Sequence, residues 1–192
     1  MTADEAYAWL MGEETSFDKH VLASILALSL SEGGAVAENA GYAGIPAVLE
    51  AFFPQAAAQL AGAETLARGD DEGCLLDLLI ANVSSGSAYE MLLAGMLARR
   101  AQWPNHLWQD LGLRHRGELS ALMTAHFAPL ARRNRSDMKW KKFFFRTICR
   151  DGEYALCTAP SCGECCDFDH CFSEETGESL LAHLRRSNEQ AV

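Results

Sequence analysis

The feature that most constrains this chain is a concentration of cysteines near its C-terminal end. Five of the seven cysteines lie between Cys157 and Cys171, in the run C-T-A-P-S-C-G-E-C-C-D-F-D-H-C, and the other two are Cys74 and Cys149. Thiols gathered this closely around a proline and a glycine predict a loop that turns about a common centre, not a regular helix or strand. The run is therefore a candidate metal centre.

The spacing of four of these cysteines indicates which metal would suit them. Cys157, Cys162, Cys165 and Cys171 form C-x4-C-x2-C-x5-C, and the first three have the spacing of a plant-type iron–sulfur loop. Zinc ribbons usually present two separate CxxC pairs, whereas here only Cys162 and Cys165 form such a pair. An iron–sulfur cluster is therefore favoured, and structural zinc is the alternative.

Two other interpretations of the cysteines fit the sequence less well. Cys162, Cys165 and His170 follow C-x2-C-x4-H, but the position that would complete a CCHC knuckle is Glu175. A disulfide framework is disfavoured by the odd number of cysteines. The acidic N-terminus does not resemble a signal peptide, and the most apolar run, residues 21–30, is too short to span a bilayer. We therefore expect a soluble, cytoplasmic protein with reduced thiols.

Composition limits the kinds of partner. The chain has 192 residues, 49% of them hydrophobic, which is enough for one domain with a substantial core. Its formal net charge is −10, which argues against a general nucleic-acid binder. We expect proteins or small ions as partners, with no nucleic acid and no membrane.

Hydrophobic residues recur at helical spacing, which predicts an all-α fold: a compact multi-helix domain with a C-terminal cysteine-rich loop. The expected helices are one capped by Thr15 or Ser16 and running to about Leu30, several short ones in the alanine-rich residues 35–67, one capped by Asp70-Asp71, and one from Ser87 to Arg99-Arg100. Cys74 is expected to be buried beside the leucines of the helix capped by Asp70-Asp71. A further apolar stripe, from Leu119 to Leu130, is expected to be closed by Pro129.

Within the single domain, residues 1–192, four segments differ in character. Residues 1–102 form an alanine-rich helical half, and residues 103–150 form helices rich in aromatic and basic residues. Residues 151–172 form the cysteine-rich loop, and residues 173–187 are expected to form a helix that closes over it.

Basic residues are concentrated immediately before the cysteine loop. Residues 132–150 contain eight of the sixteen Lys and Arg residues and one acid, Asp137. A helix from about Asp137 to Arg150 places Trp140, Phe143, Phe144, Thr147 and Ile148 on one side and Lys139, Lys142, Arg146 and Arg150 on the other. Because surface helices normally mix both signs of charge, the second side is a candidate docking face for an anion or a protein partner.

His106 lies between Trp103 and Trp108, next to a short helix expected after Pro104. It is a possible metal ligand. A single histidine beside aromatic residues is more often a hydrogen-bonded structural residue, which is the interpretation favoured here.

Three motifs in fixed order resemble the NifQ family. They are His106-Leu-Trp-Gln-Asp-Leu-Gly-Leu113, Asp137-Met-Lys-Trp-Lys-Lys-Phe-Phe-Phe-Arg146 and the C-x4-C-x2-C-x5-C run. The resemblance covers at least residues 103–172. Phe145 stands where the family has a tyrosine, so one hydroxyl group is missing from that position.

The resemblance implies a specific function. NifQ proteins supply molybdenum for assembly of the nitrogenase iron–molybdenum cofactor, and they act with the nitrogenase iron protein and the scaffold complex on which that cofactor is built. By this resemblance the ligands of the iron–sulfur cluster are Cys157, Cys162, Cys165 and Cys171. The cluster is expected to be of the 3Fe–4S type and to accept molybdenum as Mo–3Fe–4S, with molybdate or a molybdenum–sulfur species as the incoming form. Cys166, Asp169 and His170 are possible additional ligands.

Such a protein is a carrier without conventional turnover. The main alternative is a zinc-stabilised helical interaction domain that uses the basic face of residues 139–150. A redox enzyme is a third class, but the sequence contains neither G-x-G-x-x-G nor G-x-x-x-x-G-K-[ST] to bind a nucleotide cofactor.

Overall fold

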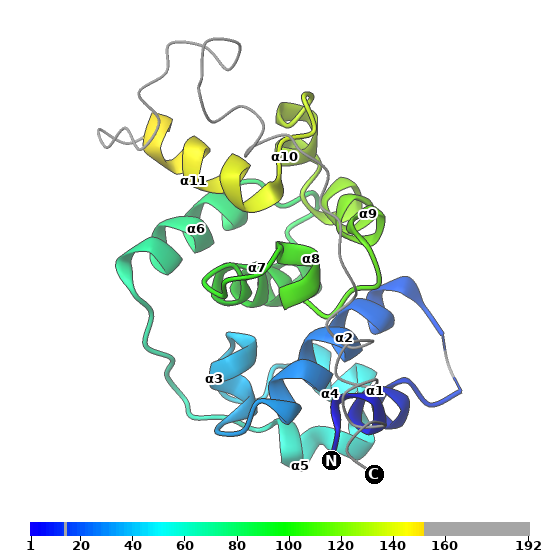
Figure 1. The fold of residues 1–192 in the computed structure, drawn as a ribbon. Coiled ribbons are helices and arrows are strands. Elements are labelled where there is room, and N and C mark those ends of the chain that lie inside the picture. The colour runs from blue at the N-terminus through cyan, green and yellow to red at the C-terminus, as the bar shows by residue number, and fades with distance from the viewer. Residues whose placement is uncertain (14, 152–192) are drawn as a thin grey trace.

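The computed structural model describes residues 1–13 and 15–151, and every regular element within these ranges is helical. This confirms the all-α prediction for that part of the chain. The elements are α1 (Ala3–Met11), α2 (Phe17–Ser31), α3 (Val36–Ala40), α4 (Ala47–Phe52), the 3-10 turn η1 (Pro54–Ala56), α5 (Ala57–Leu60), α6 (Asp70–Ile80), α7 (Ala88–Arg100), α8 (Leu107–Asp110), α9 (Arg116–His126), α10 (Ala128–Arg133) and α11 (Trp140–Asp151) (Figure 1). The short helices α3, α4 and α5 confirm the prediction for residues 35–67. That residues 1–192 form a single domain stays a prediction.

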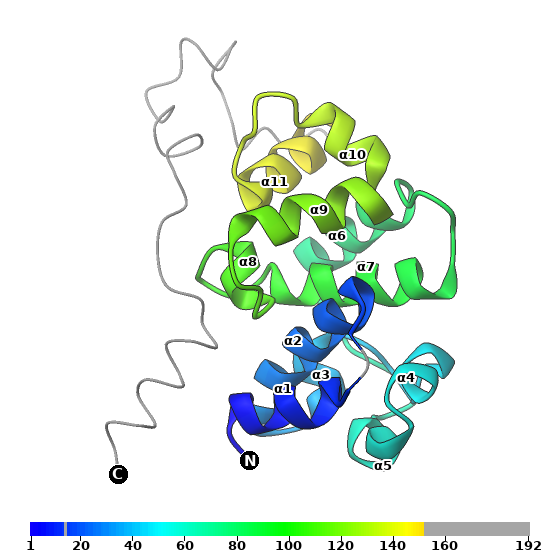
Figure 2. The ribbon, with the colours of Figure 1, turned by 90° about the vertical axis from the view of Figure 1, so that its right-hand side faces the viewer.

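The helices form three tiers. Figures 1 and 2 show α1 to α5 in the lower tier, α7 and α8 in the middle, and α6, α9, α10 and α11 in the upper tier. The middle tier therefore covers apolar surface on both of its sides, and the hydrophobic core is continuous from α2 to α11. No helix in the described part of the chain is long and apolar enough to cross a membrane.

The α2 helix forms the centre of the lower tier and is buried on nearly all of its sides between Lys19 and Ser29. Its N-cap is Ser16, whose side chain accepts a hydrogen bond from the Lys19 N–H at 3.1 Å. Of the two predicted caps, Thr15 and Ser16, the structure therefore selects Ser16. Ser24 and Ser29 are compatible with the core because each hydroxyl donates to the carbonyl four residues earlier.

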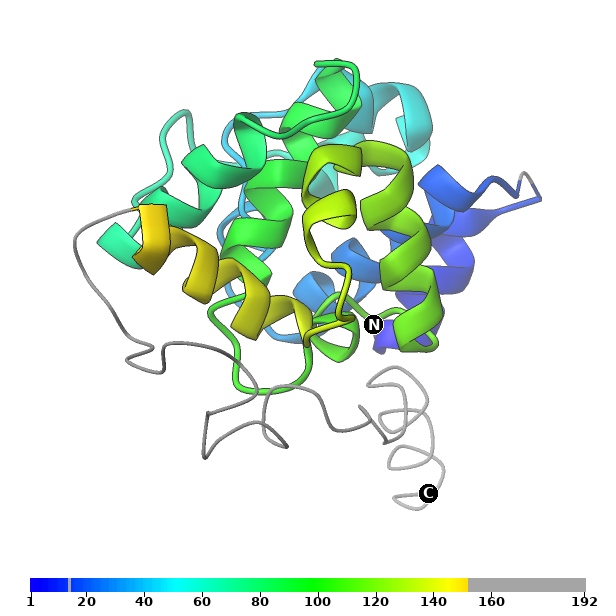
Figure 3. The ribbon, with the colours of Figure 1, turned by 90° about the horizontal axis from the view of Figure 1, so that it is seen from above.

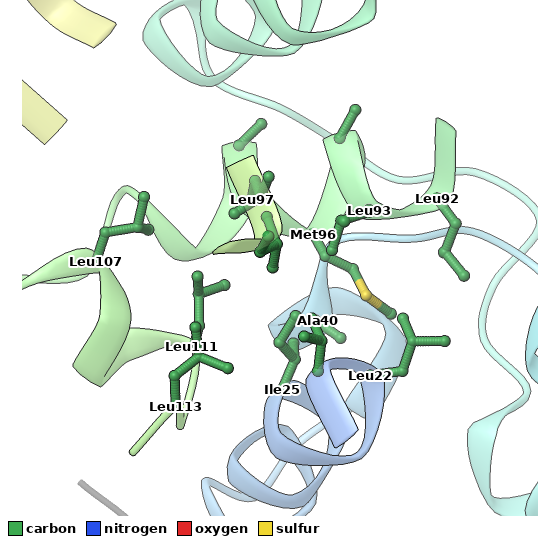
Figure 4. Packing of buried hydrophobic residues seen from close by; sticks show 14 of the residues in the cluster. Leu22, Ile25, Ala40, Leu92, Leu93, Met96, Leu97, Leu107, Leu111 and Leu113 are labelled. Carbon is green, nitrogen blue, oxygen red and sulfur yellow. The ribbon is translucent and has the colours of Figure 1, made fainter. Parts of the chain in front are cut away.

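The α7 helix packs on α2 and α3 through Leu92, Leu93, Met96 and Leu97 (Figure 4). Figure 4 also shows Leu107, Leu111 and Leu113, from α8 and the turn after it, beside this cluster. The predicted N-cap is confirmed, since the Ser87 hydroxyl accepts from the Glu90 N–H at 3.2 Å. The α7 helix of the middle tier is therefore buried over most of its surface and contacts both α3 below it and α6 above it.

The α6 helix differs from its prediction in two ways. Its N-cap is Gly69, so Asp70 and Asp71 lie in the first turn, where carboxylates interact favourably with the helix dipole. Cys74 is exposed, not buried, because α7 and α11 cover only a narrow stripe of α6 that includes Leu75 and Leu79. The prediction that Cys74 is a small buried hydrophobic residue is wrong.

The apolar stripe after residue 118 continues across a break between two helices. The α9 helix ends at His126, and Phe127 and Leu130 are both buried. Pro129 lies in the first turn of α10, where a residue without an N–H costs nothing. The expectation that Pro129 closes the stripe is therefore wrong, since it begins the next helix.

Candidate metal centre and the basic helix before it

The predicted metal ligands lie outside the described residues. These are Cys157, Cys162, Cys165 and Cys171, the possible additional ligands Cys166, Asp169 and His170, and the predicted closing helix of residues 173–187. Among residues 1–13 and 15–151, no group of three or more His, Cys, Asp or Glu side chains is arranged to hold a metal ion. What the structure describes is the support from which the cysteine run continues, namely α11 and its surroundings.

The apolar side of α11 forms as predicted. Trp140, Phe143, Phe144 and Thr147 are buried, and Ile148 is partly buried. The Trp140 ring lies 5.7 Å from both phenylalanine rings, edge-on to Phe143 and tilted to Phe144, which are favourable aromatic geometries. Seen from above in Figure 3, α11 runs along one side of the upper tier next to α6.

The helix begins at Trp140, three residues later than predicted, because a tight turn precedes it. Asp137 has a left-handed backbone with φ of 53°. The Asn134 side chain bonds both backbone groups of Met138 at 2.9 Å, and an Arg116 nitrogen donates to the Asp137 carboxylate and carbonyl oxygens at 2.8 Å. These bonds compensate for the unfavourable backbone of Asp137 and fix the start of α11.

Lys141 is partly buried and bonds two groups of the residues 103–110 segment. Its Nζ lies 2.5 Å from Asp110 Oδ2 and also donates to the Trp103 carbonyl oxygen. The Asp110 side chain is fully buried, and its other oxygen accepts from the Asn105 amide at 2.9 Å. The first and second of the three motifs are therefore joined by one partly buried ion pair, between α8 and α11.

A second buried charge, that of Arg100, also bonds Asp110, through the backbone carbonyl of this residue. Arg100 is fully buried, and its Nε donates to the Asp110 carbonyl at 2.6 Å. Its two terminal nitrogens bond the Glu32 carboxylate at 2.7 and 2.8 Å, a bidentate arrangement, while its guanidinium lies over the Trp103 ring at 4.6 Å. Residues from α2, α7, α8 and α11 are thus linked in one chain of charged hydrogen bonds.

The four predicted docking cations differ in exposure. Lys142 is exposed, Lys139 and Arg146 are partly buried, and the Arg150 side chain lies outside the described residues. Among the described residues, no acid lies within ion-pair distance of Lys142. Lys142 also lies in the first turn of α11, where the helix dipole disfavours a cation. Folding alone therefore gives no reason for its charge.

His106 has a structural position. It is the N-cap residue of α8, and its backbone N–H donates to the Gln109 side-chain oxygen at 3.3 Å. This helix start places Asp110 one turn later, facing Lys141. The described geometry therefore agrees with the structural interpretation of this histidine.

Two histidine–carboxylate contacts that hold α2 against α9 were not predicted from the sequence. His20 Nε2 lies 3.1 Å from Glu118 Oε2, and His126 Nε2 lies 3.0 Å from Asp18 Oδ1. The Asp110–Lys141 pair has a weak signal in the sequence. An acid among the apolar residues of 107–113 needs a buried partner. Lys141 lies one turn before Phe144, at the edge of the aromatic face, and so is a candidate for that partner.

Known proteins match this chain along most of its length. The profile of the NifQ family matches residues 21–173, which extend from within α2 through α11 and include the whole cysteine run. The chain belongs to the NifQ family. A NifQ homolog of Sinorhizobium fredii is 38% identical over 175 residues, which is 86% of this chain and 76% of the relative. NifQ of Rhodobacter capsulatus is 42% identical over 108 residues, 56% of this chain and 59% of that protein.

NifQ of Klebsiella pneumoniae is 50% identical over a shorter stretch of 70 residues, 35% of this chain and 41% of that protein. No solved structure matches the chain. The family membership confirms the resemblance found in the three sequence motifs. In this NifQ protein, Asp110 and Lys141 form an ion pair between two of those motifs.

Proposed function

We propose that this protein carries molybdenum and donates it for assembly of the nitrogenase iron–molybdenum cofactor. The observation that supports the proposal is membership in the NifQ family, with a match that extends to residue 173 and so includes Cys157, Cys162, Cys165 and Cys171. In this proposal these four thiolates hold an iron–sulfur cluster of the 3Fe–4S type, and molybdenum is the cargo that it accepts and releases.

The donor set fits this cargo. Thiolates are soft ligands that suit iron and reduced molybdenum, whereas molybdate arrives as a hard, doubly charged oxyanion. Cys166, Asp169 and His170 are possible additional ligands that lie close enough in sequence to address the molybdenum. The protein then has no conventional turnover. Its partners are the nitrogenase iron protein and the scaffold complex of the cofactor.

The cationic side of α11 has an electrostatic role in this proposal. A cluster held by thiolates is an anion, and an incoming oxyanion adds further negative charge. Lys139, Lys142, Arg146 and Arg150 offset this charge and guide the anion or an acidic partner toward the cysteine run. The exposed, acid-free position of Lys142 supports this assignment.

Anaerobic purification followed by metal analysis tests the proposal. We expect iron and acid-labile sulfide with substoichiometric molybdenum, and a visible chromophore. Replacing each of Cys157, Cys162, Cys165 and Cys171 by Ser should abolish the chromophore while the far-ultraviolet circular dichroism of the helices is retained. Cys74→Ser is the matched control, because this thiol is exposed on α6 and should leave the iron content unchanged.

Two outcomes would contradict the proposal. One is an oxygen-protected protein that is colourless and takes up no iron. The other is one tightly held zinc ion per chain, lost when the same cysteines are replaced, which would support the zinc-stabilised interaction domain instead.

A further inference from the structure

The contact between Asp110 and Lys141 differs from the other charged contacts of the upper tier. The Asp110 side chain is fully buried, the Lys141 side chain is 18% exposed, and both carboxylate oxygens have a donor, Lys141 on one and Asn105 on the other. The two ion-paired residues are 31 positions apart and belong to different helices. The pair is thus a directional bond between α11 and the rest of the fold.

The aromatic side of α11 does not by itself determine where the helix points. Apolar contacts between Trp140, Phe143, Phe144 and the core are non-directional, so they select the buried face but tolerate rotation and sliding. Lys141 bonds a buried carboxylate and the Trp103 carbonyl oxygen at once, and both bonds would break if α11 rotated or slid. The pair therefore sets the rotation and the axial position of α11.

The direction of α11 matters because the cysteine run follows it closely. Cys157 comes six residues after Asp151, the last residue of the helix. Six extended residues reach about 20 Å at most, so the end of α11 limits the region in which Cys157 lies. A small rotation of the helix at Lys141 would move that region as a whole.

We propose that Asp110 and Lys141 are the positioning residues of the metal centre. In this proposal they act through α11, because their ion pair holds the helix at one rotation and one axial position relative to α8. Arg100 and Glu32 anchor Asp110 from the opposite side through its backbone carbonyl. This inference rests on the proposed function for its metal readout, but its helix readout is independent of any metal.

Three variants separate positioning from stability. Lys141→Met leaves the Asp110 carboxylate buried without its cation, so both the thermal midpoint and the seating of α11 should suffer. Asp110→Asn removes the negative charge of the pair and leaves the Lys141 ammonium group without its carboxylate. In the double variant Asp110→Asn/Lys141→Met no buried charge is left unpaired, so the thermal midpoint should return toward that of the wild type. The bonds that orient α11 stay absent in the double variant.

Amide hydrogen exchange and iron content are measured on the full chain. In Lys141→Met and in the double variant we expect exchange within α11 to rise by about tenfold or more, with α2 and α7 unchanged. Iron bound per chain after anaerobic reconstitution should fall by about threefold or more in both. Arg114→Met is the control, since this cation is 68% exposed and should change neither quantity.

The double variant decides the question. Low iron content together with a restored thermal midpoint supports the positioning role. Iron content that recovers along with the midpoint would mean that the pair contributes only stability, and normal α11 exchange in Lys141→Met would also overturn the inference. If wild-type protein binds no iron, the proposed function fails, and the exchange of α11 still shows whether the pair holds the helix.

Discussion

At the residue scale, burial and hydrogen bonding compete at two glutamates. Burial raises the pKa of the Glu118 carboxyl, but the Arg114 N–H at 2.8 Å and His20 at 3.1 Å outweigh it, so the pKa lies below the usual 4.5. Glu90 is similar, with burial opposed by the N–H groups of Ser85 and Gly86, each at 2.8 Å. Both carboxylates also face a histidine.

A lowered carboxyl pKa makes a signed prediction for stability. The ionised Glu118 stabilises the fold fully above its unfolded pKa, and this contribution is lost as the pH falls through the lower folded-state pKa. Glu118→Gln should therefore reduce the free energy of unfolding by about 1–2 kcal/mol at neutral pH. It should also make the loss of stability below about pH 4.5 shallower than in the wild type.

Urea unfolding at a series of pH values measures both effects. Glu38→Gln is the control, because Glu38 is exposed and should change the profile little. If the Glu118→Gln profile ran parallel to the wild-type profile below neutral pH, the contacts with His20 and Arg114 would not be the cause.

At the element scale, glycines allow α3 and α7 to approach closely. A Cβ on Gly95 of α7 would lie 2.8 Å from the Gly41 carbonyl oxygen and 3.2 Å from an Arg68 nitrogen. Gly41 ends α3 with φ of 90°, and a Cβ added there would clash with Arg99 Cβ and with the Gly95 carbonyl oxygen. Backbone atoms cannot move aside as a flexible side chain can, so this contact requires glycine at both positions.

The same substitution at two helical glycines should therefore have opposite effects. Gly95→Ala should destabilise the protein by about 1–3 kcal/mol, because the added methyl group forces α3 and α7 apart despite the better helix propensity of alanine. Gly73→Ala in α6 has no neighbour within 4 Å and should stabilise by about 0.5–1 kcal/mol. The urea midpoints of the two variants measure this, and a stabilising Gly95→Ala would contradict the close packing.

At the scale of the whole molecule, charge is segregated along the chain. Residues 132–150 carry eight basic residues and one acid, while residues 152–192 carry eight acids and two arginines. Lys141 pairs with Asp110, and Asp137 is bound by Arg116 from α9. The exposed Arg132, Arg133, Arg135 and Lys142 form a cationic surface, and the acid within this segment, Asp137, is paired with Arg116.

This surface predicts salt-dependent metal loading. Lys142→Gln/Arg146→Gln should slow molybdenum uptake or transfer by about threefold to tenfold at low ionic strength, because the attraction of an oxyanion or an acidic partner is weakened. The difference should disappear at about 0.5–1 M salt, where charges are screened over a few ångströms. Stopped-flow loading measures the rate, and Arg114→Gln is the exposed control. Equal rates at low salt would reject the electrostatic role.

Much of this protein could be predicted from local sequence. The start of α2 at Ser16, the start of α7 at Ser87 and the aromatic side of α11 were all correct, because a cap and a 3.6-residue periodicity are properties of a few neighbouring residues. The family was equally accessible, since its motifs are short and ordered along the chain.

Tertiary structure decided which side chains of these helices meet a partner. Lys141 looked like one more cation of the basic segment, and Cys74 looked like a buried neighbour of an apolar stripe. The neighbouring helices instead pair Lys141 with a buried carboxylate and leave Cys74 exposed. The decisive contacts join residues 31 and 98 positions apart, at Asp110–Lys141 and His20–Glu118. A helix's own sequence specifies which residues share a face. How much of that face is buried, and which charged groups it meets, depend on the helices packed against it.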